Sequence, residues 1–221
     1  MLQVQVVARM KKYVDAINKE VKAWIKLATS EALLEERVAA LDNLVQYVVD
    51  KVGAQDEVHI NFICTHNSRR SQLSQVWAQV ASYYFQVPAY CYSGGVEVTA
   101  FNDRAVASLE RAGFSISQSG SENPRYEISF GEECPTIQAF SKLYDDTDNP
   151  SKGFAAVMTC SHADENCPFI PGADVRLPIR YDDPKEYDGT KLEATMYDAR
   201  SLQIASEMFY VFRQASARLS K

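Results

Sequence analysis

A cysteine followed six positions later by an arginine marks the part of the sequence best suited to chemistry. The segment CTHNSRRS runs from Cys64 to Ser71 and follows a short apolar run. Backbone N–H groups in such a turn converge on one point and can bind a tetrahedral anion, and a following helix adds partial positive charge there. Arg70 offers a planar fork for two oxyanion oxygens. Because the same field favours a thiolate, Cys64 is predicted to be a nucleophile that attacks a bound oxyanion.

Two further cysteines, Cys160 and Cys167, lie in the polar segment TCSHADENCP. Cys160 ends a predicted strand, so it should lie at the same edge of a parallel sheet as Cys64. The odd total of five cysteines, without an export signal, favours thiol chemistry or inert buried cysteines over a disulfide framework. Zinc is a weaker alternative, because no His or Cys partner stands at finger spacing. Cys91 is expected in the core, and Cys134 is expected to be incidental.

The elements that must position these residues alternate between strands and helices. Short apolar runs predict strands at 58–64, 89–94, 154–160 and 175–181. Helical patterns lie at 71–85, 102–112, 136–144 and 192–219. This alternation predicts an α/β fold with a parallel, doubly wound sheet, whose ligand sites lie beyond the carboxyl ends of the strands.

Residues 4–51 carry two amphipathic patterns that predict an N-terminal helical hairpin, ended by Gly53. We therefore expect a hairpin over 1–55 and a catalytic domain over 56–221, with the polar stretch 118–152 as an insertion. The hairpin could pack on the sheet, cover the insertion or form a homodimer, and the sequence leaves these open. Trp77 and the tyrosines are interpreted as packing residues.

Composition excludes several classes of function. A net charge of −6 and a pI near 5.2 argue against a general nucleic-acid binder. The N-terminus carries charges too early for a signal peptide, and no stretch reaches the roughly 18 apolar residues of a membrane span. A cytoplasmic protein without membrane or nucleic-acid partners is therefore expected.

The loop CTHNSRRS resembles the phosphate-binding loop of the low-molecular-weight protein tyrosine phosphatases and of the thioredoxin-coupled arsenate reductases built on the same fold. Further segments resemble this family in the same order: YSGG at 92–95, AFNDRAVASLERAGFSIS at 100–117 and DDP at 182–184. The similarity covers roughly residues 58–215. It implies a flavodoxin-like domain with four parallel strands and helices on both faces.

The resemblance also implies roles for single residues. Cys64 would be the nucleophile and Arg70 the anion clamp. Ser71 would hydrogen-bond the thiolate, and Asp183 would protonate the leaving oxygen as general acid. The oxyanion would be bound by the loop itself, namely Thr65, His66, Asn67, Ser68, Arg69 and Arg70, with Asn67 also holding the loop in shape. His66 and Arg69 depart from the family, which commonly has glycine and a small or thiol residue there.

The segment 159–168 resembles the redox helix of thioredoxin-coupled arsenate reductases, including the six residues between its cysteines and the following Pro168. This implies that Cys64 attacks arsenate, that Cys160 attacks Cys64 and expels arsenite, and that Cys167 then takes over the disulfide for thioredoxin or a similar dithiol. His162 is a candidate to tune Cys160. A phosphatase would need Cys64 alone, because water hydrolyses its phospho-thiol intermediate.

The sequence thus favours arsenate reduction over a second enzymatic interpretation, the hydrolysis of phosphotyrosine or small phosphate esters. A third interpretation is a non-enzymatic anion-binding module. No cofactor is predicted. Some thioredoxin-coupled members bind potassium near the loop, and Gln75 and Glu122 fall where its ligands are expected, but Gln75 is neutral.

Overall fold

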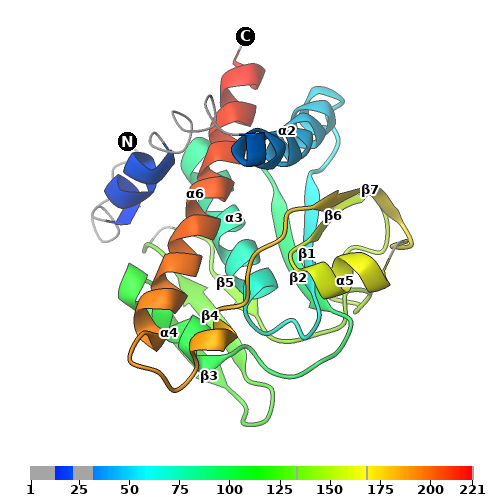
Figure 1. Cartoon of the computed structure of the whole chain (residues 1–221). Helices are drawn as coiled ribbons and strands as arrows, with labels where there is room; N and C mark the ends of the chain where they lie inside the picture. The colour runs from blue at the N-terminus through cyan, green and yellow to red at the C-terminus, as the bar shows by residue number, and fades with distance from the viewer. Residues whose placement is uncertain (1–12, 22–31, 133, 168, 221) are drawn as a thin grey trace.

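A four-stranded parallel sheet forms the centre of the protein, whose computed structural model describes residues 13–21, 32–132, 134–167 and 169–220 (Figure 1). The strand order is β2-β1-β6-β7, and all three neighbouring pairs run parallel. The strands are β1 His59–Cys64, β2 Tyr90–Gly95, β6 Phe154–Met158 and β7 Ala173–Pro178. This confirms the predicted parallel sheet and the positions of its strands.

Alternating side chains divide the core between the two faces of the sheet. In β6, Ala155 and Val157 join one buried cluster, whereas Phe154, Ala156 and Met158 join another, as the two-residue period of a strand requires. The first face is covered by α2 Ala32–Gly53, α3 Arg70–Phe85 and α6 Glu193–Leu219. The short helix α5 Ser161–Asn166 contacts the second face through β1 and β6. Helices therefore lie on both faces, as predicted.

A second sheet stands where the sequence predicted an insertion and a helix. It is antiparallel, in the order β3 Ser115–Ser119, β4 Arg125–Ser129 and β5 Ile137–Ala139. The helix predicted at 136–144 was therefore wrong. The reason is a two-residue period: Ile137 and Ala139 are buried and Gln138 is exposed, as Tyr126 and Ile128 are buried around exposed Glu127. Helix α4, Asp103–Ala112, precedes this sheet at the predicted place.

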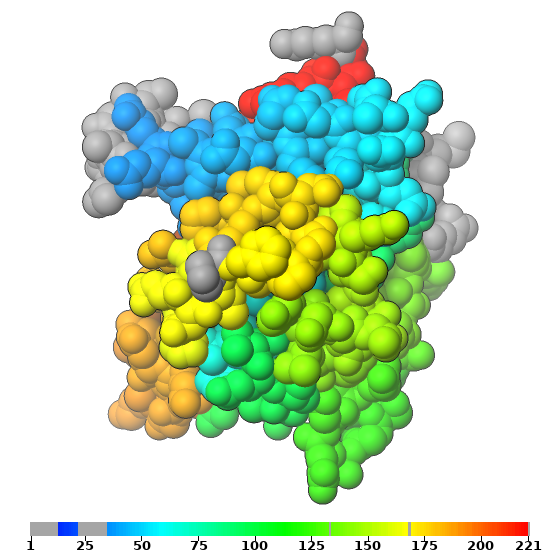
Figure 2. All heavy atoms as spheres, turned by 90° about the vertical axis from the view of Figure 1, so that its right-hand side faces the viewer, coloured from blue at the N-terminus to red at the C-terminus, as the bar shows by residue number. Residues whose placement is uncertain are grey.

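The N-terminal helices share the core of the sheet domain. Residues 13–21 are helical, and Tyr13 stacks on Trp77 of α3 with ring centroids 5.1 Å apart. Trp77 is fully buried, as expected of a packing residue. Figure 2 shows α2, in blue to cyan, lying across one end of the molecule beside the yellow segment that carries α5 and β7. The rest of the predicted hairpin lies outside the described residues, and the domain boundary at residue 55 stays a prediction.

Across the described ranges, we find no helix with the length and apolar character needed to cross a membrane.

Candidate active site

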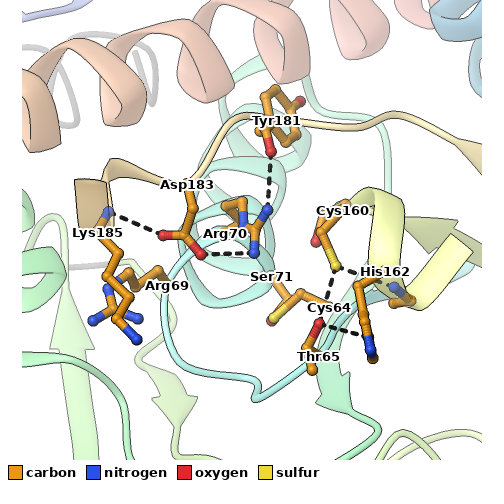
Figure 3. A network of polar contacts seen from close by, with 12 residues as sticks. Cys64, Thr65, Arg69, Arg70, Ser71, Cys160, His162, Tyr181, Asp183 and Lys185 are labelled. Carbon is orange, nitrogen blue, oxygen red and sulfur yellow. Dashed lines mark hydrogen bonds and ion pairs between the residues drawn. The ribbon is translucent and has the colours of Figure 1, made fainter.

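The loop from Cys64 to Arg70 joins the carboxyl end of β1 to the start of α3, as the sequence predicted (Figure 3). Cys64 is buried, and no side chain caps the first turn of α3. The first N–H groups of a helix have no partner within the helix, so they are open to an anion in the loop. The sheet therefore delivers the thiol to a site with positive electrostatic character.

Ser71 connects the thiol to the loop. The amide of Asn67 donates to Ser71 Oγ at 2.8 Å, and Ser71 Oγ lies 3.1 Å from Cys64 Sγ. Ser71 Oγ accepts from Asn67 and keeps its own proton, which it can donate to the sulfur once Cys64 is a thiolate. Asn67 adopts φ of 45°, in the left-handed region that asparagine tolerates better than most residues.

The carbonyl groups of the loop face the scaffold behind it. The carbonyl of His66 accepts from the hydroxyls of Ser141 and Thr99, at 3.0 and 3.1 Å. The carbonyl of Asn67 accepts from the Gln72 amide at 3.0 Å. Carbonyls turned outward leave the N–H groups of the same peptides available on the inner side.

The glycines of YSGG allow this packing. A Cβ on Gly95 would lie 2.7 Å from the Asn67 nitrogen, and one on Gly94 would lie 2.3 Å from the backbone of Tyr144. Only glycine permits such a close approach of backbone to backbone. The YSGG segment at the end of β2 therefore lies directly against the loop from Cys64 to Arg70, here called the anion loop.

Arg70 and Asp183 meet above the loop although 113 residues separate them (Figure 3). Arg70 Nη2 donates to Asp183 Oδ2 at 2.7 Å, and Nη1 donates to the Tyr181 carbonyl at 3.1 Å. Arg70 Nε is buried and has no partner in the described part of the chain. Asp183 also accepts from the Lys185 N–H and so caps the short helix Pro184–Tyr187. The structure thus brings the predicted clamp and the predicted acid together.

The side chains of Arg69 and His66 are directed at protein partners. Arg69 Nε donates to the hydroxyl of Tyr197 at 2.8 Å, and its guanidinium lies 3.4 Å from Asp188. His66 pairs with Glu97 at 3.3 Å on the surface. Since both side chains contact other protein groups, Arg69 and His66 can contact an anion in the loop through their backbone N–H groups.

All three predicted relay cysteines contact one apolar cluster on the second face of the sheet. Cys160 caps α5 by accepting from the Ala163 N–H at 3.4 Å, and its sulfur lies 3.4 Å from the Thr65 hydroxyl of the loop. That hydroxyl is also 3.3 Å from Nδ1 of His162, so His162 reaches Cys160 through Thr65 (Figure 3). Burial raises the pKa of the Cys167 thiol, and the nearby Arg176 opposes this effect.

Cys91 does not belong to this group. It lies in the other core cluster, where burial raises the pKa of its thiol strongly, as expected of an inert core cysteine. Cys134 is half-buried against that cluster, near Gly131.

The sequence pattern did not single out the charged residues that anchor α5. Asp164 is buried and receives guanidinium groups from Arg176, at 2.6 Å, and from Arg180. Arg176 also donates to the carbonyl groups of Cys167 and Asp164. The available signal was the pair of arginines in the otherwise apolar segment VRLPIRY, since buried charges require partners.

The residues expected near a potassium ion do not form an acidic pair. Gln75 is buried, and its amide accepts from Ser93 and donates to the Gln138 carbonyl. Glu122 is exposed. Within the described ranges, no cluster of three His, Cys, Asp or Glu side chains could hold a metal ion.

No family model matches the chain, but curated relatives do. It is 32% identical to an arsenate reductase of Staphylococcus aureus strain Newman over 127 residues, which cover 57% of this chain and 77% of the relative. An arsenate reductase of Brevibacillus brevis is 30% identical over 125 residues, which cover 57% and 75%. The chain belongs to the arsenate reductase family. This membership confirms the resemblance that the loop and the cysteine segment had suggested.

An arsenate reductase of Halalkalibacterium halodurans is 28% identical over 134 residues, which cover 61% of this chain and 79% of the relative. Among solved structures, a low-molecular-weight phosphotyrosine phosphatase from Vibrio cholerae aligns with a TM-score of 0.47 at 13% identity, covering 70% of this chain and 93% of that one. A likeness at that score adds no support for fold or function.

Proposed function

We propose that this protein reduces arsenate to arsenite through Cys64, Cys160 and Cys167, with thioredoxin or a similar dithiol as electron donor. The observation that carries the proposal is that one apolar cluster contains Cys64 and Cys160 and packs against Cys167, beside an anion loop. Family membership supports the same chemistry. A phospho-thiol mechanism alone gives no reason for two additional thiols at this edge of the sheet.

The first step would form a bond between sulfur and arsenic. The Cys64 thiolate attacks arsenate held by the loop N–H groups and Arg70, and one arsenate oxygen leaves as water after protonation. Asp183 is the acid placed for this, since it lies on Arg70. Anion binding would take over part of the Arg70 fork and so release Asp183 toward the leaving oxygen.

The second step would transfer two electrons. The Cys160 thiolate attacks the Cys64 sulfur, the sulfur–arsenic bond breaks, and its electron pair stays on arsenic, which leaves as arsenite. Cys160 is suited to this attack because its sulfur touches Thr65 in the loop and accepts the Ala163 N–H at the start of α5. The product is a disulfide between Cys64 and Cys160.

The third step would require α5 to unwind. Cys160 and Cys167 bracket the helix and are seven positions apart, which corresponds to about 10 Å along a helix. A disulfide needs Cα atoms within about 7 Å. When Cys167 attacks Cys160, Cys64 leaves as a thiolate, and the 160–167 disulfide can then be reduced by an external dithiol.

The decisive experiment measures arsenite released per enzyme with and without a thioredoxin system. Cys160→Ser and Cys167→Ser should abolish multiple turnover, while Cys64 still reacts once with arsenate. Cys91→Ser is the matched control, since Cys91 is a buried cysteine outside the cluster. Unchanged steady-state reduction in both relay variants would refute the relay.

Hydrolysis of aryl phosphates is the second candidate, because the Arg70–Asp183 pair and the Cys64–Ser71 contact involve no other cysteine. Aryl phosphate hydrolysis should be measured in parallel on the same variants. Rapid hydrolysis that is unchanged in Cys160→Ser and Cys167→Ser would favour a phosphatase.

A further inference from the structure

A pocket of about 580 Å³ lies away from the thiol cluster, between the edge strand β2 and the edge strand β5 of the second sheet. Its volume lies in the range of small-molecule sites and far exceeds the space that one inorganic ion needs. Its apolar lining includes Pro135, Ile137 and Phe140.

Lys142 is the unusual group in this lining. Only 4% of the residue is exposed, and none of the described residues accepts a hydrogen bond from its ammonium group. Its Nζ lies 4.6 Å from the centre of the Phe140 ring, and the Arg125 guanidinium stacks 3.7 Å from the same centre. Two cations thus share one aromatic ring, and a buried ammonium without an anion is costly.

The acidic residue of the lining compensates little. Asp148 is 53% exposed and reaches Arg125 only at 3.5 Å. Burial lowers the pKa of Lys142, Asp146 and Asp148 oppose this, and Arg125 adds to it, so that the pKa falls from 10.5 to about 8. At neutral pH the pocket therefore keeps a mostly protonated ammonium that a bound anion would stabilise.

The amide side chains of the pocket are already satisfied. Gln79 donates to the Ala89 carbonyl and accepts from the Cys91 N–H. Gln75 is held by Ser93 and by the Gln138 carbonyl. The donors left for a ligand among the described charged groups are Lys142 and Arg125, which selects a negatively charged ligand.

We propose that this pocket binds a small organic anion whose carboxylate group contacts Lys142 and Arg125 and whose apolar body lies against Tyr92 and Ile137 of the lining. The site is separate from the anion loop but adjacent to it, since the backbone N–H of Lys142 donates to Asn67 Oδ1. The proposal does not depend on which reaction Cys64 performs.

Benzoate is a suitable probe, because its carboxylate is planar whereas the loop is built for tetrahedral anions. We expect ¹H–¹⁵N spectra of the full chain to show saturable shifts at Tyr92, Gln138 and Lys142, with a Kd of about 1 mM or tighter. Saturating the loop with inorganic phosphate should leave these shifts in place. Lys142→Met should abolish them, and Arg125→Gln should weaken binding severalfold.

Lys152→Met is the matched control, because Lys152 is exposed just before β6, two strands away from β2 in the sheet, and does not line the pocket. The proposal is overturned if wild-type protein shows no saturable shifts, if phosphate displaces benzoate, or if Lys142→Met binds as tightly as the control. Should Lys142→Met fail to fold, Arg125→Gln and the phosphate competition still decide, because Arg125 lies largely on the surface.

Discussion

Ser71 has one hydroxyl proton, and the direction of that proton determines how the loop acts on Cys64. Its oxygen accepts from the Asn67 amide and lies 3.1 Å from the sulfur, so the hydroxyl can donate to a Cys64 thiolate. A second single group is the Lys142 side chain, which belongs to a residue only 4% exposed and whose pKa is lowered by burial. Both features are single groups whose removal has a measurable and separate consequence.

Ser71→Ala should slow alkylation of Cys64 about tenfold at neutral pH, because a hydrogen bond to a charged group is worth about 1.5–3 kcal/mol. Iodoacetamide labelling followed by mass spectrometry of the Cys64 peptide measures this rate. Ser74→Ala is the control, since the Ser74 hydroxyl bonds only to the Arg70 carbonyl one turn away. Equal rates in the two variants would mean that Ser71 does not stabilise the thiolate.

Lys142→Met should change how stability depends on pH. The pKa of Lys142 is lowered from 10.5 to about 8, so between these values the unfolded chain binds more protons than the folded one. The free energy of unfolding of the wild type should therefore rise with pH across this window, and the variant should lack this rise. The free energy of unfolding of Lys142→Met, measured by urea titration, should exceed that of the wild type by up to about 3 kcal/mol at pH 7, and this difference should shrink toward pH 10. A constant difference across the window would contradict the assignment.

Helix α5 is the element that the proposed relay must rearrange, and six residues are too few for it to be stable alone. Its anchor is Asp164, held by Arg176 and Arg180 from β7 and the segment after it. Arg176 also fixes the carbonyl of Cys167. The anchor therefore keeps the two cysteines apart until the helix unwinds.

Asp164→Asn should loosen α5 without touching a cysteine. Loss of the carboxylate leaves two guanidinium groups without their anion, so amide hydrogen exchange in 161–167 should accelerate at least tenfold. Alkylation of Cys167 should rise as well. Glu165→Gln is the control, because Glu165 is exposed in the same helix. Exchange that matches the control would show that the arginines do not hold the helix.

At the scale of the whole molecule, α2 is joined to the active site by one short segment. Arg37 of α2 forms an ion pair with Glu207 of α6 at 2.6 Å and donates to the Arg180 carbonyl. Its guanidinium lies 4.7 Å from the centre of the Tyr181 ring, and the Tyr181 carbonyl accepts from Arg70. The N-terminal helix thus supports the backbone that orients the anion clamp.

Arg37→Met should destabilise the fold by about 3–5 kcal/mol, because it leaves the buried Glu207 carboxylate, 4% exposed, without its cationic partner. Arg218→Met breaks a second pair between the same two helices, Arg218–Asp42 at 3.6 Å, which is far more exposed and should cost less than about 1 kcal/mol. Urea denaturation of both variants gives the comparison. Similar losses would show that burial does not set the strength of these pairs.

Much of the fold could be read from local pattern because the parallel strands are short apolar runs and α4 and α6 carry strong helical periods. The second sheet could not, since RYEIS and TIQAF are brief and stand among turn residues. Their alternation becomes meaningful only when β3, β4 and β5 pair. For strands this short, the local sequence does not predict the secondary structure, and pairing with distant strands decides it.

The sequence by itself determined the position of the loop, its predicted nucleophile and the spacing of the two further cysteines, because these depend on residue types close together along the chain. Only the tertiary structure decided that Asp183 lies on Arg70, that Arg69 contacts Tyr197, and that Lys142 is buried beside Arg125. Those contacts join elements distant in sequence, and side chains acquire such partners only when the sheets and helices pack. A motif of neighbouring residues can therefore be recognised from the sequence, whereas the partners of a charged side chain depend on how the elements pack.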